Sequence, residues 1–565
     1  FNYLELKKEL LDAGRRFATT SDTEVVLQLY EEHGDAFLSR MNGQFALAIW
    51  DQKRQRLLCA RDRLGIRPLY YALPAGLFVF GSEVKALFAH PAVHRAIDPL
   101  GLDEIFSFWC THAPRTAYEG VHDLPPGCYL TVEKGTVSVR KYWSLDYSDP
   151  LTITDEEAGD RVLSLLTEST RLRLRSDVPV GVYVSGGLDS AVTAALAVRA
   201  SSYPLESYSL GFTVSELDES AFQREVAARL GTTHHEVRCS PADIGRVFPE
   251  VIAHAEQPIL RTAPAPLFLL SQLVRKNDKK VVLTGEGADE ILGGYDIFKE
   301  AKIRRFWSRF PDSKTRPLLL RRLYPYMKSI QAQPEAYLQA FFHVRSEDLD
   351  NPFFSHLPRW RLTEKTKLFF SPRVRNAIAR AGSSHAQDRL AAALPEAFDS
   401  WGHFAQAQYL ESVLLLPGYI LSSQGDRMTM GNSVEGRFPF LDHHLVELAA
   451  RLPAHTKMKV LDEKHVLKRA AKGLVPESVL RRPKQPYRAP DAISFFDPDK
   501  QCARFEYVDE LLSEAALEKT DLFSPAPVQK LVAKAKSGRV VGVQDNMALV
   551  GILSTQLACH ALLEM

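Results

Sequence analysis

Residues 185–190, with the sequence SGGLDS, constrain the fold of this chain more than any other segment. They follow an apolar run at 180–184 that predicts a buried strand, and they precede an alanine-rich helical segment at 191–199. The N–H groups and dipole at such a helix start favour an anion, and two glycines let the backbone approach it closely. This strand, turn and helix therefore predict a phosphate site in an α/β fold.

The side chains of this turn fit the same interpretation. The hydroxyls of Ser185 and Ser190 add hydrogen-bond donors beside Gly186 and Gly187, and Asp189 is suited to hold Mg²⁺. The spacing differs from the GxxxxGK[ST] motif of P-loop kinases and GTPases, and the lysine of that motif is missing. A plain Gly-Gly turn after a buried strand is the alternative.

Length and charge bound the class of protein. A chain of 565 residues is too long for one core, so we expect at least two domains. The net charge is +1, from 70 basic and 69 acidic residues, which argues against nucleic-acid or membrane partners. We find no signal sequence and no apolar run of membrane-spanning length. The six scattered cysteines favour free thiols in the cytoplasm.

The chain divides near residues 147–150, which gives predicted domains at 1–147 and 150–565. In the first, short β-prone runs separated by turns predict an α+β fold with antiparallel strands. In the second, strands at 181–184, 207–212, 235–239 and 280–283 alternate with helices. This alternation predicts a doubly wound parallel sheet with ligands at the carboxyl ends of its strands. Beyond residue 295 we expect mostly helix.

A second glycine-rich turn, TGEGADE at 284–290, follows the strand at 280–283. Its three carboxylates would repel one another unless a cation or a basic partner is bound. Mg²⁺ shared with phosphate oxygens meets this need, which makes Asp289 a second candidate ligand beside Asp189. A solvated acidic loop is the alternative.

These motifs resemble those of the asparagine synthetase (glutamine-hydrolysing) family, and the likeness covers nearly the whole chain. The motifs of the second part are SGGLDS at 185–190, TGEGADEILGGY at 284–295, LPGY at 416–419, QGDRM at 424–428, SVEGRFPFLD at 433–442, KHVLKRA at 464–470 and RPKQ at 482–485. Those of the first part are SDTE at 21–24, NG at 42–43, ARDRLGIRPLY at 60–70 and SEVKAL at 82–87. The resemblance implies an N-terminal-nucleophile glutaminase with layered antiparallel sheets, followed by an ATP pyrophosphatase domain.

The resemblance also implies the reaction. The carboxylate of aspartate attacks the α-phosphate of ATP, and ammonia then converts the acyl-adenylate to an amide and AMP. Glu286 matches a glutamate important for forming the intermediate, and Lys484 matches a lysine near the α-phosphate. The resemblance places Val184 and Leu210 beside the adenosine, and the backbone of Thr284 and Gly285 against the nucleotide.

Each of two further segments allows two interpretations. Asp426, Arg427 and Glu435 either build the pocket for the acid substrate or form a buried ion-pair scaffold. The stretch 302–328 holds nine basic residues against one acidic residue, with aromatic residues between them. A solvated helical face explains this stretch better than an RNA site, because the whole chain is close to neutral.

The first part departs from the family in one way. The family's nucleophile is a cysteine at residue one whose free α-amine assists. This chain starts with Phe1, which aligns after that segment, and Cys59 lies in a predicted strand without a terminal amine. Asp22 is the matched residue of the glutamine pocket, where the resemblance implies that it holds the α-amino group. As the sequence stands, we expect ammonia-dependent synthesis only, and we expect the natural protein to carry the missing segment.

The acid substrate stays open at this stage. The family's Asp-Glu-Pro appears here as Glu256-Gln257-Pro258, which leaves aspartate open to question as the substrate. A related amide ligase or cyclase of secondary metabolism is the first alternative, and a catalytically silent nucleotide-binding paralogue is the second. By analogy with the family, we expect small-molecule partners (ATP, the acid, and ammonia or glutamine) and a homodimer.

Overall fold

The computed structural model describes residues 1–382, 385–540 and 542–564. Its N-terminal region combines helices with two antiparallel sheets, of strand order β1-β2-β6-β7 and β4-β3-β5. The predicted α+β character with antiparallel strands is therefore confirmed. The elements are α1 (Tyr3–Asp12), α2 (Asp22–His33), α3 (Phe37–Arg40), β1 (Ala46–Asp51), β2 (Arg56–Arg61), β3 (Tyr70–Ala72), β4 (Val79–Gly81), α4 (Val84–Phe88), α5 (Pro99–Phe108), β5 (Val121–Asp123), β6 (Cys128–Glu133) and β7 (Thr136–Lys141).

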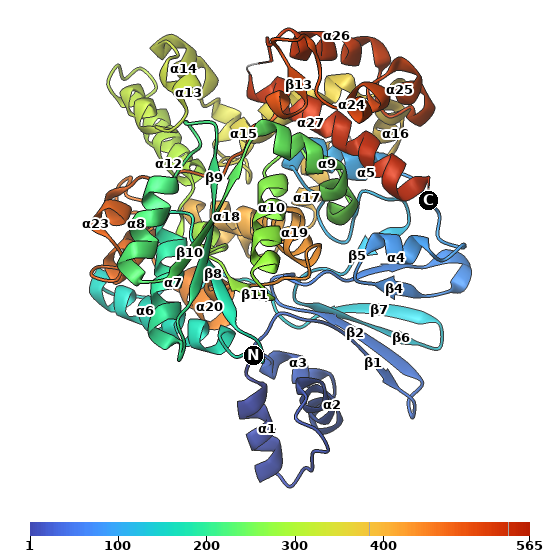
Figure 1. Cartoon of the computed structure of the whole chain (residues 1–565), viewed down its shortest axis with the longest axis vertical. Coiled ribbons are helices and arrows are strands. Elements are labelled where there is room, and N and C mark those ends of the chain that lie inside the picture. Colours follow the sequence, from blue (N-terminus) through green and yellow to red (C-terminus); the bar gives the residue numbers. More distant parts are fainter. Residues whose placement is uncertain (383–384, 541, 565) are drawn as a thin grey trace.

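A five-stranded parallel sheet forms the centre of the molecule (Figure 1). Its order is β10-β9-β8-β11-β12, so β8 has β9 on one side and β11 on the other. The predicted parallel sheet is confirmed. Its elements and the helices between them are α6 (Asp155–Arg173), β8 (Val180–Tyr183), α7 (Leu188–Ala200), β9 (Glu206–Phe212), α8 (Ser220–Leu230), β10 (Thr233–Cys239), α9 (Pro241–Ala255), α10 (Pro264–Lys276), β11 (Val281–Leu283) and β12 (Glu435–Arg437).

Helices cover both faces of this sheet. In Figure 1, α6, α7 and α8 lie on one side of it, and α9, α10 and α19 lie on the other. Strand β8 reads Val-Gly-Val-Tyr and all four residues are buried, as expected for a central parallel strand between two helical layers. Gly181 within it is required by packing, since a Cβ there would lie 2.8 Å from the Tyr208 ring.

The remainder of the chain is mostly helical, as expected. It also contributes β12, which the sequence did not reveal, and, among the described residues, three π-helical segments: η7 (Glu411–Ile420), η8 (Ser422–Asp426) and η11 (Cys559–Leu563). The other elements are α11 (Ala288–Leu292), α12 (Asp296–Ser308), α13 (Lys328–Gln331), α14 (Glu335–Phe341), α15 (Leu357–Glu364), α16 (Pro372–Arg380), α17 (Ala386–Ala391), α18 (His403–Leu410), α19 (Arg427–Met430), α20 (His443–Arg451), α21 (Ala454–Lys457), α22 (His465–Ala470), α23 (Glu477–Arg481), β13 (Phe496–Asp497), β14 (Cys502–Ala503), α24 (Glu506–Leu511), α25 (Glu514–Thr520), α26 (Pro525–Lys536) and α27 (Val543–Ala558).

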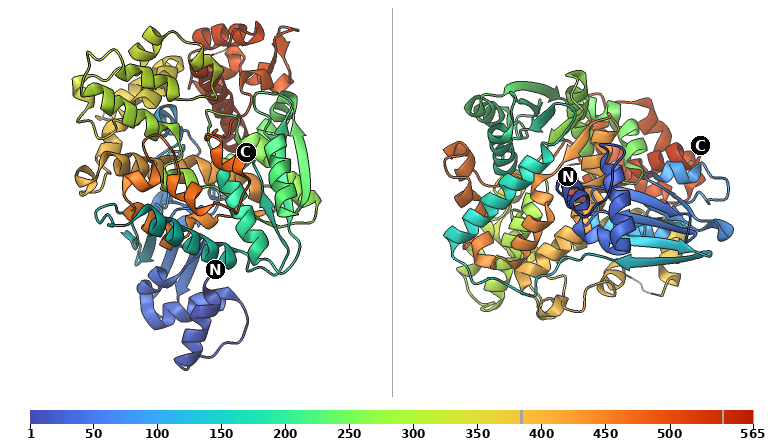
Figure 2. Two further views of the ribbon diagram at one scale, coloured as in Figure 1. Left: turned by 90° about the vertical axis from the view of Figure 1, so that its left-hand side faces the viewer. Right: turned by 90° about the horizontal axis from the view of Figure 1, so that it is seen from below.

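The N-terminal region and the rest of the chain share a core. Helices α1, α2 and α3 protrude at one end of the molecule (Figure 2), whereas α5 packs among the C-terminal helices. The ring of Phe108 in α5 lies 4.5 Å from that of Trp360, and Phe106 lies 5.0 Å from Phe370. The predicted boundary near 147–150 falls between β7 and α6, in a segment without regular secondary structure.

One expectation about apolar runs is wrong. Among the residues with a described structure, Val543–Leu563 forms a helical stretch of 21 residues that is long and apolar enough to cross a membrane. Of its most apolar window, 78% is buried inside the protein, where α27 packs against α9 and α15. Polar residues such as Asp545, Ser554 and Gln556 interrupt this stretch in the sequence, so it does not read there as one continuous apolar run.

Candidate functional site

The two glycine-rich turns meet at the carboxyl ends of neighbouring strands. Residues of β11 pair with β8, so the turn after β11 lies beside residues 185–190. A Cβ at Gly285 would lie 2.9 Å from the carbonyl carbon of Asp189 and from the nitrogen of Ser190. Only glycine therefore permits this approach, which joins the two predicted motifs into one site.

The first turn is held by its own serines. The Ser190 hydroxyl oxygen accepts a hydrogen bond from the Ser185 amide at 3.0 Å and lies 2.9 Å from the Ser185 hydroxyl. The Gly187 amide donates to the Ser185 hydroxyl at 3.3 Å. Gly186 has φ of +76°, which a residue with a side chain rarely adopts. The turn then enters the 13-residue helix α7.

Two lysines connect the two aspartates of the site. Lys464 Nζ lies 2.6 Å from Asp189 Oδ2 and 2.7 Å from Asp289 Oδ1. Lys484 Nζ lies 2.5 Å from Asp289 Oδ2 and 3.6 Å from Asp189 Oδ2. Basic partners therefore already compensate the carboxylates. Lys464 begins the motif at 464–470, but nothing in its local sequence marks it as a site residue.

Burial and these charges set the protonation of the site. Burial raises the pKa of Glu286 to about 7. The positive charge of Lys484 lowers this pKa but offsets only part of the rise. Although burial raises the pKa of Asp289, the charges of Lys464 and Lys484 lower it overall. Burial and the charge of Asp289 raise the pKa of Glu290 to about 8. The turn at 284–290 thus holds one carboxylate, Asp289, and two protonatable glutamates, Glu286 and Glu290.

A cavity of about 50 Å³ opens beside these groups. It is lined by the first turn and by the loop that carries Lys484. The Arg482 guanidinium donates to the Gly186 carbonyl at 3.3 Å and pairs with Glu219. The Lys484 amide donates to Glu463 Oε1 at 3.0 Å. Arg482 and Glu463, which the sequence did not single out, therefore fix this loop against the phosphate turn.

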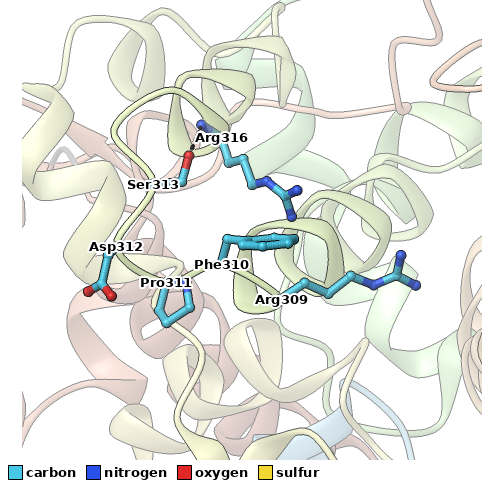
Figure 3. A pocket seen from close by; sticks show the side chains of 6 residues that line it. All are labelled: Arg309, Phe310, Pro311, Asp312, Ser313 and Arg316. Carbon is cyan, nitrogen blue, oxygen red and sulfur yellow. Dashed lines mark hydrogen bonds between the residues drawn. The ribbon is translucent and has the colours of Figure 1, made fainter.

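A larger but open pocket of about 380 Å³ lies elsewhere, between α12 and the segment after it (Figure 3). The Arg316 guanidinium lies 3.9 Å from the Phe310 ring centroid and donates to the Phe306 carbonyl. Other basic groups of 302–328 are bound similarly: Lys302 donates to the Met458 carbonyl and Arg304 to that of Phe354. Several basic side chains of this stretch thus donate hydrogen bonds to backbone carbonyls. The stretch is therefore not the simple solvated helical face that we expected.

The residues expected beside the adenosine lie at the same sheet edge. The Val184 amide donates to the Tyr208 carbonyl at 2.9 Å, and the Leu210 carbonyl accepts from Gln223 at 2.9 Å. The Thr284 amide donates to the Arg437 carbonyl at 3.0 Å. Val184, Leu210 and Thr284 are all buried. Their contacts with a nucleotide stay predictions.

Asp426, Arg427 and Glu435 lie where the two regions of the chain meet. Arg67 bonds Asp426 and approaches Glu435 Oε1 at 3.3 Å. Arg427 reaches Glu83 at 3.3 Å and Glu256 at 3.2 Å. Glu256 also accepts from the amides of Val84 and Lys85 at the start of α4. This geometry favours the scaffold alternative.

The candidate residues of the first region lie away from this cluster. Asp22 is exposed in the first turn of α2. Cys59 is buried in β2, and burial raises the pKa of its thiol to about 12, which suits a structural residue. In β10 of the second region, the adjacent residues His234 and His235 could suggest a metal pair, but they have different partners. His234 lies between Ser207 and Ser209, and His235 faces Glu206.

Two family models match the chain in consecutive segments. The model described as asparagine synthase matches residues 161–564, and the one described as glutamine amidotransferase domain matches residues 1–143. The first covers the parallel sheet, both glycine-rich turns and both lysines. The second covers the antiparallel sheets.

Curated relatives match over most of their length. Asparagine synthetase [glutamine-hydrolyzing] 3 of Bacillus subtilis is 30% identical, over 86% of this chain and 74% of that protein. Amidase chyE of Penicillium rubens is 31% identical, over 86% of this chain and 75% of that protein. Amidase chry2 of Gibberella zeae is 31% identical, over 87% of this chain and 76% of that protein. Both synthetases and amidases are thus among the proteins that this chain resembles.

Proposed function

The chain belongs to the asparagine synthetase family, and from this premise we propose that it forms an amide from a carboxylic acid with ATP, through an acyl-adenylate. The observation that carries the proposal is the joining of Asp189 and Asp289 by Lys464 and Lys484 beside the SGGLDS turn. A phosphate turn next to two fixed cations suits chemistry at the phosphates of ATP.

The reaction has two balanced steps. A carboxylate oxygen of the acid attacks the α-phosphorus, the bond to the bridging β-phosphate oxygen breaks, and pyrophosphate leaves with the electron pair. Ammonia then attacks the acyl carbon and loses a proton, and the bond from that carbon to AMP breaks. Negative charge develops on the phosphates in the first step and on the acyl oxygen in the second, so fixed cations lower both barriers.

The residues take the following roles in this proposal. The turn of Ser185, Gly186, Gly187 and Ser190 holds the pyrophosphate, and the Lys484 ammonium faces the α-phosphate. Val184 and Leu210 flank the adenosine, while Thr284 and Gly285 meet the nucleotide through the backbone. Their place at the carboxyl ends of β8, β9 and β11 supports these roles, because open α/β sheets bind ligands there.

Mg²⁺ fits the donors of the site. Asp189 and Asp289 converge closely enough to share one lysine nitrogen, and carboxylates with phosphate oxygens are the ligands that Mg²⁺ prefers. These two residues would hold the ion, which when bound neutralises charge on the pyrophosphate. Lys464 compensates both carboxylates in the protein itself.

Glu286 accepts the proton that ammonia releases in this proposal. Its pKa of about 7 places it close to the working pH, where a carboxylate both accepts and returns protons efficiently. Glu286 Oε2 has no hydrogen-bond partner among the residues whose structure is described, so it is available to a reactant.

We propose ammonia as the nitrogen that reacts at the adenylate. It is taken up directly, or it is released from glutamine by a nucleophile that we do not identify among residues 1–143, where Asp22 would hold the glutamine α-amino group. The match to a glutamine amidotransferase domain supports glutamine as the source. The domains are proposed at 1–147 and 150–565, with the second a doubly wound ATP pyrophosphatase domain.

A second candidate keeps the chemistry and changes the acid. The similarity to two fungal amidases favours it. The segment Glu256-Gln257-Pro258 also favours it, because Glu256 accepts a hydrogen bond at the start of α4 and pairs with Arg427 rather than with Lys484. Incubation with ATP, ammonium and a panel of acids tests both candidates. AMP and pyrophosphate from aspartate support the first candidate, and their formation only from another acid supports the second. ADP, or ATP binding without turnover, contradicts the proposal.

A further inference from the structure

We propose that Trp109, Arg261 and Arg359 form the subsite that selects the acid, and that it binds a second anionic group at the far end of an extended carboxylic acid. This inference rests on the proposed function and deepens it. The three residues come from distant parts of the chain: Trp109 follows α5, Arg261 precedes α10, and Arg359 lies in α15.

The tryptophan ring lies close to both arginines. The Arg261 guanidinium carbon lies 5.0 Å from the Trp109 ring centroid, and that of Arg359 lies 5.7 Å from it. The indole N–H donates to the Thr363 hydroxyl at 3.0 Å, which fixes the ring. Trp109 has φ of +78°, an uncommon and strained value for a bulky residue, and such strain clusters at binding sites.

Both guanidinium groups keep a donor without a partner. Arg261 pairs with Asp491 at 3.3 Å through a terminal nitrogen, and Arg359 pairs with Glu411 at 2.7 Å in the same way. The Nε atoms of both arginines are buried and make no hydrogen bond to any residue in the described ranges. An unmade hydrogen bond of a buried charged group is costly, and a carboxylate satisfies such donors well.

A π-helical part of the chain contacts Trp109. Segments η7 and η8 carry Tyr419 and Ser422, and the hydroxyls of both are buried without a partner in the described structure. The Tyr419 ring meets that of Trp109 edge-on at 6.4 Å between centroids. π-Helical turns occur often at functional sites, because they place side chains that an α-helix would turn away. This is a second, independent indication of a ligand.

The loop that carries Lys484 connects this subsite with the reaction centre. Asp491, which pairs with Arg261 at 3.3 Å, lies in the same irregular segment, residues 483–491, as Lys484 and Tyr487. The hydroxyls of Tyr183, Tyr419 and Tyr487 all lack a hydrogen-bond partner among the described residues. In this proposal the reacting carboxylate lies near Glu286 and Lys484, and the chain of the acid extends along this loop toward Arg261 and Arg359.

The acid panel on the unaltered protein tests the inference. Initial rates of pyrophosphate release are compared for adipate against hexanoate and for succinate against butyrate, each with ATP and ammonium. We expect each diacid to exceed its monoacid at least tenfold in kcat/KM, and adipate to exceed succinate. Equal values within each pair would overturn the inference and leave the amide-ligase proposal standing. Release from aspartate but from none of these four acids would overturn the inference alone, and no release from any of the five would overturn both.

Variants of the two arginines test whether these residues cause the preference for diacids. Arg261→Gln and Arg359→Gln should each raise the KM for the preferred diacid at least tenfold, with little change in the KM for ATP. The matched control is Arg316→Gln at the open surface pocket, which should change neither value. A loss of kcat that is equal for diacids and monoacids would assign the arginines to structure and contradict the subsite. If a variant does not fold, the diacid-to-monoacid ratio of the unaltered protein remains decisive.

Discussion

Lys464 and Asp189 are 275 residues apart in the sequence, and their side chains meet at 2.6 Å in the buried centre of the site. The same ammonium lies 2.7 Å from Asp289, so one lysine joins the two glycine-rich turns. Lys464 has φ of +48° at the start of α22, a backbone position fixed by the turn before that helix. The contacts of Lys464 with both aspartates identify the site more clearly than the small cavity beside it does.

Replacement of Lys464 should damage both stability and activity. Lys464→Met leaves two buried carboxylates short of one positive charge, which typically costs about 3–5 kcal/mol. We expect a clear fall in melting temperature and at least a hundredfold loss of pyrophosphate release. Lys459→Gln, at an exposed pair with Asp155, is the control and should change little. A stable and active Lys464→Met protein would refute the structural role given to this lysine.

Glu286 should make stability depend on pH. Its pKa is raised to about 7 from an ordinary value near 4.5, so the folded state keeps a proton that the unfolded state loses between these values. The stability that this proton contributes is present below pH 4.5 and is lost as the pH rises through 7. Glu286→Gln does not titrate at this position, so its free energy of unfolding should not fall in this way. The free energy of unfolding of the variant minus that of the unaltered protein should therefore rise by on the order of 2 kcal/mol between pH 5 and pH 8. Melting temperatures at both pH values check this, and an unchanged difference would contradict the raised pKa.

Gly285 should tolerate no side chain. A Cβ there meets the backbone of Asp189 and Ser190 at 2.9 Å, and backbone cannot move aside as a flexible side chain can. We expect Gly285→Ala to raise the KM for ATP at least tenfold, because the two turns are pushed apart. Gly402→Ala is the matched control, since no atom lies within 4 Å of its Cβ position. Equal ATP affinity of the two variants would exclude the close approach of the turns.

Arg67 should hold the two regions of the chain together. It bonds Asp426, whose side chain is only 5% exposed, across the interface. Arg67→Gln leaves that carboxylate without its cation, and we expect the melting temperature to fall by roughly 5 °C or more. Arg54→Gln, at an arginine whose side chain is 66% exposed beside Asp51, should have almost no effect. Similar melting temperatures for both variants would count against the interface role of Arg67.

Local patterns predicted much of the fold and the phosphate half of the site. The apolar residues 180–184 and the SGGLDS turn predict a strand, a turn and a helix start, because each depends on neighbouring residues alone. Residues 284–290 are recognisable for the same reason. Both turns lie in the structure at neighbouring strand ends, as the alternation of strands and helices requires.

Contacts between distant segments explain what the sequence did not reveal. Lys464 becomes a site residue only because α22 packs against α6 and brings it to Asp189. Strand β12 has three residues and is defined by its partner β11. Trp109 follows a helix of the N-terminal region, and no local pattern shows that its indole reaches Arg261. These relationships depend on tertiary packing, which a periodic pattern does not encode.

The most direct test of the central claim follows the oxygen of the acid. The acid that releases pyrophosphate is prepared with ¹⁸O in its reacting carboxylate, and the products of a reaction with ATP and ammonium are examined by mass spectrometry. Attack on the α-phosphorus predicts AMP that carries one ¹⁸O atom, together with unlabelled pyrophosphate. Unlabelled AMP, or ADP in its place, would contradict an acyl-adenylate at the site that Lys464, Asp189 and Asp289 form.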